Sequence, residues 1–186
     1  VNSNPDNPII NNRSFGENPE KVGRMGVAYM KGMQDNNILA CAKHFPGHGD
    51  TDSDSHKTLP TVNQLKYRLE EVELLPYRML IENGLGSVMV AHLYIPSLDD
   101  TKNLPASLSS KVVNGLLKKE MGFTGLAITD ALNMNGVSQF YAPGEVDVKA
   151  LLAGNDILLF AQDVPKAIEE IKKAIKQKKI SQKEID

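Results

Sequence analysis

Four short apolar runs alternate with longer helical patterns, and this alternation most constrains what the chain can fold into. The runs are ILACA at 38–42, SVMVA at 87–91, LAIT at 126–129 and DILLF at 156–160. Apolar residues recur at helical spacing between them, and no hairpin turn signal joins one run to the next. Strands that alternate with helices build a parallel sheet covered by helices. The sequence therefore predicts an α/β fold with about four strand–helix units.

Capping residues predict where the helices begin and end. Asn18 followed by Pro19 is predicted to open the first helix. Pro76 lies inside a longer apolar pattern and is expected to kink that helix. Ser109 is expected to cap the next one. The predicted helices cover residues 18–34, 63–82, 109–121, 146–153 and 164–177, and a last short helix is expected from Ser181.

Composition excludes some functions. The 186 residues carry a formal net charge of −2, which gives no field for capturing nucleic acid or an anionic membrane surface. No apolar run approaches the roughly 20 residues that a membrane span needs. The single cysteine, Cys41, rules out an internal disulfide, and its place inside ILACA predicts a buried small side chain.

A long polar stretch, KHFPGHGDTDSDSHKTLP at 43–60, directly follows the first apolar run. It offers few apolar side chains for burial, and polar loops of this length inside a compact domain are usually functional or disordered. Polar loops that follow the carboxyl ends of parallel strands are where ligands bind in α/β folds. The stretch is therefore predicted to be an active-site loop. It contains the titratable residues His44, His48, Asp50, Asp52, Asp54 and His56.

Three further positions are candidates for chemistry. Asp130 directly follows LAIT, so its carboxylate would point into the mouth of the sheet; the alternative is a helix N-cap. Asp54 and His56 are two residues apart, so in an extended segment they project to the same side, and a carboxylate that holds one ring nitrogen makes the other a better base. The alternative for this pair is a solvated loop.

Two strand ends carry possible ligand-binding groups. Lys43 and His44 end the first run and could donate hydrogen bonds to ligand hydroxyls, although a plain charge at a strand end is equally compatible with the spacing. His92 follows SVMVA, so it would line the same mouth or serve a structural role.

A metal site is disfavoured. The His and Asp cluster lacks a helical HExxH and a cysteine framework, and the Asp50 to Asp54 spacing lacks the glycine and distal glutamate of a calcium loop. No GxGxxG or GxxxxGK[ST] pattern indicates a nucleotide site. We therefore expect no metal and no cofactor.

Three sequence motifs, taken together, resemble those of a known family. KHFPGHGDTDSDSHKTLP, with RSFGENP upstream and ITDALNM downstream, resembles the family 3 glycoside hydrolases, and more narrowly their β-N-acetylglucosaminidase branch. The resemblance covers the chain from Asn4 to about Asp163. It implies a (β/α)₈ TIM barrel, of which this chain holds about four units. On that comparison the chain is a single C-terminal portion of the barrel domain, with the N-terminal strands missing.

The resemblance also implies roles. It makes Asp130 the nucleophile of a retaining mechanism, His56 the acid–base and Asp54 its partner, and it gives sugar contacts to Arg13, Lys43 and His44. Most retaining glycosidases use two carboxylates, so a His–Asp dyad is a departure from that scheme. The implied substrate is terminal β-linked N-acetylglucosamine, from peptidoglycan fragments.

Several alternatives stay open on the sequence. A β-glucosidase or related exo-glycosidase of the same family is one, and water or phosphate can be the acceptor. An inactive carbohydrate-binding or structural fragment is another, and a metal hydrolase is a weaker rival. The absence of an initiator Met suggests a piece of a longer protein. A half-barrel exposes sheet edges and an apolar face, so we expect it to be part of a larger chain or to self-associate. The compartment stays undecided between cytoplasm and periplasm.

Overall fold

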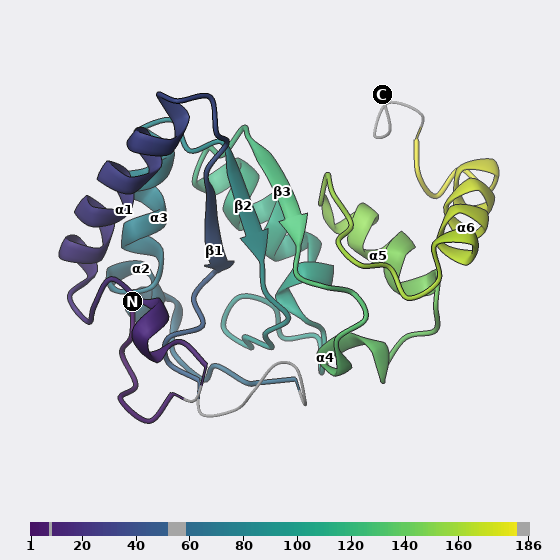
Figure 1. Ribbon diagram of the computed structural model, residues 1–186. Helices are drawn as coiled ribbons and strands as arrows, with labels where there is room; N and C mark the ends of the chain where they lie inside the picture. The colour runs from purple at the N-terminus through teal and green to yellow at the C-terminus, as the bar shows by residue number, and fades with distance from the viewer. Residues whose placement is uncertain (8, 52–58, 182–186) are drawn as a thin grey trace.

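A three-stranded parallel sheet forms the centre of the protein. The computed structural model describes residues 1–7, 9–51 and 59–181. The strands are β1 (Cys41–Phe45), β2 (Ser87–Val90) and β3 (Leu126–Thr129), in the order β1-β2-β3. All three run in the same direction, so their carboxyl ends meet at one edge of the sheet (Figure 1). The α/β class expected from the alternation of apolar runs and helical patterns is confirmed.

Helices flank the sheet on the outside. In Figure 1, α1 and α3 lie beyond β1, and α5 and α6 lie beyond β3. The α-helices are α1 (Pro19–Gln34), α2 (Lys66–Glu71), α3 (Leu74–Glu82), α4 (Asn135–Ser138), α5 (Glu145–Ala153) and α6 (Val164–Lys176). Two 3₁₀ turns, η1 (Asn11–Arg13) and η2 (Ala106–Leu108), and a π-helix, η3 (Lys111–Glu120), complete the described elements.

The two faces of the sheet differ in burial. Val88 and Ala127 are register partners and are fully buried toward the helices. Met89 and Ile128, one residue further along each strand, point to the opposite face and are only half-buried. Cys41 on β1 is exposed, which corrects the expected burial of this side chain. Among the described residues β1 pairs with another strand on one side only, and Cys41 lines a cavity beside it.

The first helix begins where the capping residues in the sequence predict it. The Asn18 side chain accepts a hydrogen bond of 2.8 Å from the backbone N–H of Lys21, and Pro19 occupies the first turn. This satisfies one of the four backbone donors that a helix start leaves open. The predicted start of this helix and its predicted end at Gln34 are both confirmed.

Two predicted elements near the polar loop differ from the structure. The first strand begins at Cys41 rather than Ile38, and Ile38 is 56 % exposed because it precedes the sheet instead of lying in it. The helix expected over 63–82 is two helices, interrupted at residues 72–73. Pro76 lies in the first turn of α3, where its missing N–H costs nothing, so it opens a helix rather than kinking one.

The C-terminal third also departs from expectation. Residues 156–160 do not form a fourth strand; Ile157 makes one isolated bridge to Ile128, and the backbone N–H of Leu159 donates to the Thr129 hydroxyl instead of continuing a ladder. In α6 the helical spacing of the apolar residues predicts that Ile168 is buried, but it is 48 % exposed. The helix expected from Ser181 lies outside the described residues.

None of the described helices has the length and apolar character needed to cross a membrane.

Candidate functional site

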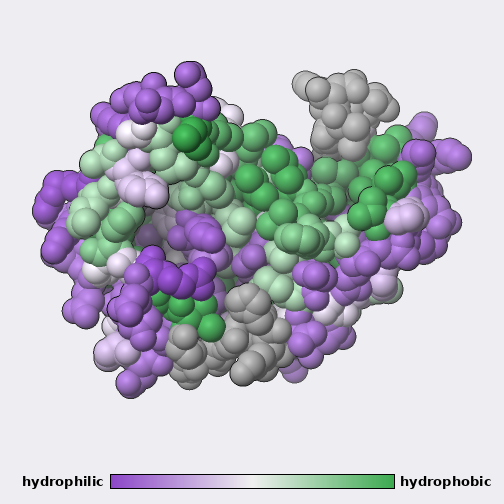
Figure 2. Space-filling view, viewed as in Figure 1, coloured by the Kyte–Doolittle hydropathy of each residue, from purple (hydrophilic) through white to green (hydrophobic). Residues whose placement is uncertain are grey.

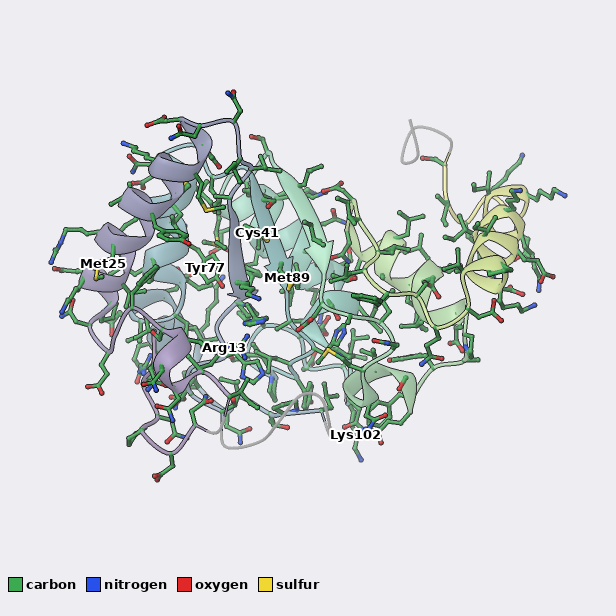
Figure 3. The ribbon with its side chains drawn as sticks, viewed as in Figure 1. Arg13, Met25, Cys41, Tyr77, Met89 and Lys102 are labelled. Atoms are coloured by element: carbon green, nitrogen blue, oxygen red, sulfur yellow. The ribbon has the colours of Figure 1, made fainter. Side chains whose placement is uncertain are left out.

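The carboxyl ends of the strands carry the candidate site. Lys43 and His44 lie in β1, Asp130 follows β3, and Arg13 ends the 3₁₀ turn η1, near the carboxyl end of β1 (Figure 3). Arg13, Lys43, His48 and Asp130 all act electrostatically on the His44 ring. Four of the predicted site residues, taken from segments up to 117 positions apart (130 − 13), are thus brought together.

His44 is held neutral by its surroundings. Burial lowers the pKa of its imidazole from 6.5 to about 4, and the neighbouring cations Lys43 and Arg13 act in the same direction, while Asp130 opposes them. Its Nδ1 is buried and has no hydrogen-bond partner among the described residues. An unpaired polar atom of this kind is costly unless a ligand or water satisfies it. His44 is therefore suited to exchange a hydrogen bond with a ligand hydroxyl.

Asp130 is fixed by its own backbone and by the next residue. Its N–H donates to the carbonyl of Val90 at 2.9 Å, which attaches the end of β3 to β2. Its carboxylate Oδ1 accepts from the N–H of Ala131 at 2.9 Å. Asp130 does not cap a helix, because the next helix begins only at Asn135. A half-buried, oriented carboxylate at the strand end is what a nucleophile requires.

The beginning of the polar loop is braced by the N-terminal segment. The buried Asn7 side chain donates to the carbonyl of His48 at 2.7 Å and to the Thr51 hydroxyl at 3.3 Å. The Thr51 hydroxyl lies 2.7 Å from His48 Nδ1. The rings of His44 and His48 meet edge to face, with centroids 5.9 Å apart. His48 is therefore a supporting residue of the described part of the loop.

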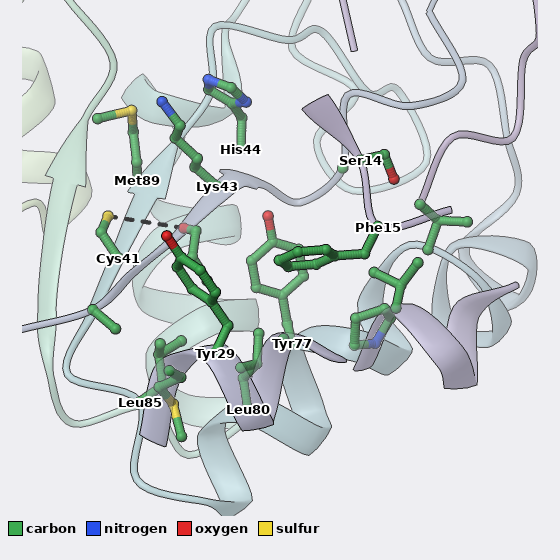
Figure 4. A pocket seen from close by; sticks show the side chains of 18 of the residues that line it. Ser14, Phe15, Tyr29, Cys41, Lys43, His44, Tyr77, Leu80, Leu85 and Met89 are labelled. Atoms are coloured by element: carbon green, nitrogen blue, oxygen red, sulfur yellow. Dashed lines mark hydrogen bonds between the residues drawn. The ribbon is translucent and has the colours of Figure 1, made fainter. Parts of the chain in front are cut away.

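A cavity of about 510 Å³ adjoins the cluster between α1, β1 and α3 (Figure 4). Arg13, Lys43 and His44 line it together with apolar and aromatic residues, among them Tyr29 and Tyr77. Asp130 is outside its lining. The cavity thus extends from the cluster along β1 toward α1 and α3 and does not include Asp130.

His92, predicted at the mouth, is placed beneath it. The ring is fully buried, with Nδ1 2.7 Å from the Ser107 hydroxyl and Nε2 3.0 Å from the carbonyl of Ala131. Both ring nitrogens therefore contact protein groups. This geometry favours the structural role that the sequence left open, and a direct sugar contact by His92 has no support from it.

Three supporting residues were not found from the sequence. Asn7 is one of many asparagines in its segment, and Ser107 lies in a stretch without a motif, so neither carries a signal. Glu73, 2 % exposed, lies between two helices and accepts from Arg68 at 2.8 Å and from Ser3 at 3.2 Å. Burial raises the pKa of Glu73, and the Arg68 cation opposes that rise. The helical pattern of the sequence does not predict that a charged residue at this position is buried.

The predicted dyad belongs to the part of the polar loop that the structure does not describe. Asp54 and His56 lie outside the described residues, and so does Asp52. Within residues 1–7, 9–51 and 59–181, no three His, Cys, Asp or Glu side chains are grouped as a metal site. The described part of the site therefore contains cationic and imidazole hydrogen-bond donors and one carboxylate in a fixed orientation.

The chain matches a known protein family and is similar in sequence to known relatives. A family model described as the glycosyl hydrolase family 3 N terminal domain matches residues 1–186. The beta-hexosaminidase A of Pseudoalteromonas piscicida is 41% identical over 169 residues, which is 86% of this chain and 28% of that protein. The chain therefore spans less than a third of the length of this relative.

Solved structures agree with the sequence relatives. A family 3 beta-N-acetylglucosaminidase from a Paenibacillus species matches with a TM-score of 0.96 and 44% identity, covering 100% of this chain and 36% of that one. A beta-glucoside phosphorylase matches with a TM-score of 0.94 and 27% identity, covering 100% of this chain and 35% of that one. Over the matched part the chain thus has the fold of these two proteins, which agrees with the expected α/β fold class.

Proposed function

Because this chain belongs to glycosyl hydrolase family 3, we propose that it carries the catalytic residues of a retaining exo-glycosidase that releases terminal β-linked N-acetylglucosamine. The supporting observation is the convergence of Arg13, Lys43, His44 and Asp130 at the carboxyl edge of the sheet. Two cations and a neutral imidazole, whose Nδ1 has no hydrogen-bond partner among the described residues, can bind the hydroxyls of a sugar. A single oriented carboxylate beside them can reach its anomeric carbon.

The proposed reaction has two steps. The Asp130 carboxylate attacks C1 of the sugar while His56 gives its proton to the leaving oxygen, so that a covalent glycosyl-enzyme forms and the aglycone departs. His56 then takes a proton from water, which attacks C1 and restores the Asp130 carboxylate. Asp54 would hold the His56 ring in the tautomer that this exchange requires. His56 and Asp54 enter on the family motif.

The substrate is proposed from the loop motif and from the relatives. Both the Pseudoalteromonas beta-hexosaminidase and the Paenibacillus beta-N-acetylglucosaminidase are named for hexosamine substrates. Peptidoglycan fragments are a natural source of terminal N-acetylglucosamine, and we propose them as the substrate class. A β-glucoside substrate, or phosphate in place of water, is the second candidate, favoured by the likeness to a beta-glucoside phosphorylase. A carbohydrate-binding fragment without turnover is the remaining alternative.

The test compares two aryl glycosides and two substitutions. We expect the protein to cleave an aryl N-acetyl-β-glucosaminide faster than the aryl β-glucoside. Asp130→Asn should lower kcat by a factor on the order of 10⁴ or more, because no glycosyl-enzyme can form. Asp35→Asn, an exposed aspartate at the end of α1, is the matched control and should leave kcat unchanged.

The same experiment separates the alternatives. Mass spectrometry of the protein quenched during turnover should show one added sugar on a peptide that contains Asp130. His56→Ala should slow an activated aryl substrate less than Asp130→Asn does, because a good leaving group needs little protonation. A preference for the glucoside would favour the second candidate. No cleavage of either compound would leave the carbohydrate-binding alternative.

A further inference from the structure

We propose that His92 is a positioning residue that orients Asp130 through the backbone of Ala131. The inference rests on the proposed function, which gives Asp130 its role as nucleophile. His92 does not touch the sugar on this proposal; it acts from beneath the site, at the end of β2, on the residue that follows the carboxylate.

The contacts of the ring show what Nε2 does. A carbonyl oxygen can only accept a hydrogen bond, so His92 Nε2 carries a proton and donates it to Ala131 at 3.0 Å. On the other side of the ring, Nδ1 lies 2.7 Å from the Ser107 hydroxyl. The ring is fully buried and its contact with Ser107 is buried, while its contact with Ala131 is part-buried.

Ala131 transmits this contact to the carboxylate. Its carbonyl is held by His92, and its N–H donates to Asp130 Oδ1 at 2.9 Å. Both groups belong to one residue, so fixing the carbonyl restricts the backbone rotations that would carry the N–H away. The Asp130 carboxylate is thereby held in one rotation beside the strand end.

The ring in turn rests on a fixed support. Ser107 is fully buried in η2, and its N–H donates to the carbonyl of Ala91 at 3.2 Å. The side chain of Asn155, itself 2 % exposed, donates to the Ser107 carbonyl at 2.8 Å. Hydrogen bonds thus connect five residues in order: Asn155, Ser107, His92, Ala131 and Asp130. The series begins just after the end of α5 and ends at the Asp130 carboxylate.

Two substitutions separate positioning from simple stability. The amide nitrogen of a glutamine reaches about as far as His Nε2, so His92→Gln keeps a donor for Ala131. An asparagine amide reaches only about as far as Nδ1, so His92→Asn keeps the Ser107 contact and loses the donor to Ala131. Each variant leaves one buried partner unsatisfied, so both should lower Tm by similar amounts.

The kinetic outcome should differ between them. A small displacement of a reacting group can cost about 10²-fold in rate. We expect His92→Asn to lower kcat by about 10- to 100-fold with KM within about twofold of wild type, and His92→Gln to keep kcat within about fivefold. Equal losses of kcat in the two variants, or wild-type kcat in both, would overturn the proposal.

A second measurement does not depend on turnover. The Ala131 amide proton, observed by NMR in ¹⁵N-alanine-labelled protein and assigned with an Ala131→Ser variant, reports its hydrogen bond to Asp130. We expect its resonance to move upfield in His92→Asn and to stay in place in His92→Gln. An unmoved resonance in His92→Asn contradicts the positioning role. A wild-type protein inactive on both aryl glycosides would instead contradict the proposed function, and the amide measurement would still decide the role of His92.

Discussion

His44 illustrates how single residues set the chemistry of the site. Its ring lies near two cations and one carboxylate, but burial dominates and lowers its pKa to about 4. At neutral pH the ring therefore exchanges hydrogen bonds without carrying charge, while Lys43 and Arg13 supply the positive charges. Neutral donors and acceptors suit sugar hydroxyls. The buried Nδ1, which has no hydrogen-bond partner in the part of the chain that the structure describes, is the atom available for one.

The lowered pKa of His44 predicts a loss of stability in acid. In the unfolded chain the ring titrates near 6.5, but in the folded protein it stays neutral until about pH 4. Between these values the unfolded state binds the extra proton, so stability present above pH 6.5 is lost as the pH falls toward 4. At pH 5 this loss is about 2 kcal/mol relative to pH 7.5.

Urea unfolding at pH 7.5 and pH 5 checks this, with His44→Gln as the comparison. The glutamine cannot titrate, so the variant should lose about 2 kcal/mol less than wild type between the two pH values. Every other titrating group is common to both proteins and cancels in the difference. An identical loss in both proteins would show that the ring is not held neutral.

At the scale of elements, the sequence predicted well what local interactions determine. The Asn18 cap and Pro19 fix the start of α1, and LAIT is β3 at its predicted bounds because both faces of that strand are apolar. The same reasoning failed where a distant partner decides. Residues 38–40 have strand propensity, but β1 begins only at Cys41, where β2 provides a partner.

The site residues also differ in whether local sequence or a distant contact determines their place. Polar residues at strand ends predicted Lys43, His44 and Asp130, because parallel strands place their carboxyl ends at one edge. The depth of a side chain below that edge is not encoded in its spacing. His92 therefore looked like a mouth residue, although it lies beneath the mouth, and the brace from Asn7 depends on a contact 41 positions away.

The end of α5 provides a test of a glycine at this scale. Gly154 has a φ of 106°, and a side chain there would also collide with Asn114 of η3. We expect Gly154→Ala to destabilise the protein by about 1–2 kcal/mol or more. Gly115 is the matched control, since it lies inside η3 with its nearest neighbour at 3.7 Å. Gly115→Ala should be neutral or stabilising by up to about 1 kcal/mol. Equal urea midpoints for the two variants would refute this account.

At the scale of the whole molecule, one face of the sheet governs behaviour in solution. Apolar residues gather across the front of the sheet and toward α5 and α6 (Figure 2). Leu39, Leu126, Ile157 and Phe160 are 40–68 % exposed, and Met89 and Ile128, which are register partners on β2 and β3, are half-buried. Among the described residues, β1 also pairs on one side only. An unpaired strand edge beside an exposed apolar face is a template for association.

We therefore predict that the 186-residue chain, produced by itself, associates with further copies through this face. Size-exclusion chromatography with light scattering should give a mass above that of one chain, rising with concentration. The double variant Leu39→Ser/Ile157→Ser should shift the equilibrium toward the monomer, because it removes apolar area worth roughly 25 cal/mol per Å². Leu65→Ser is the control, since Leu65 is 60 % exposed at the start of α2, away from the sheet, and its loss should not change the mass. A compact monomer at every concentration would mean that the exposed face alone does not drive association.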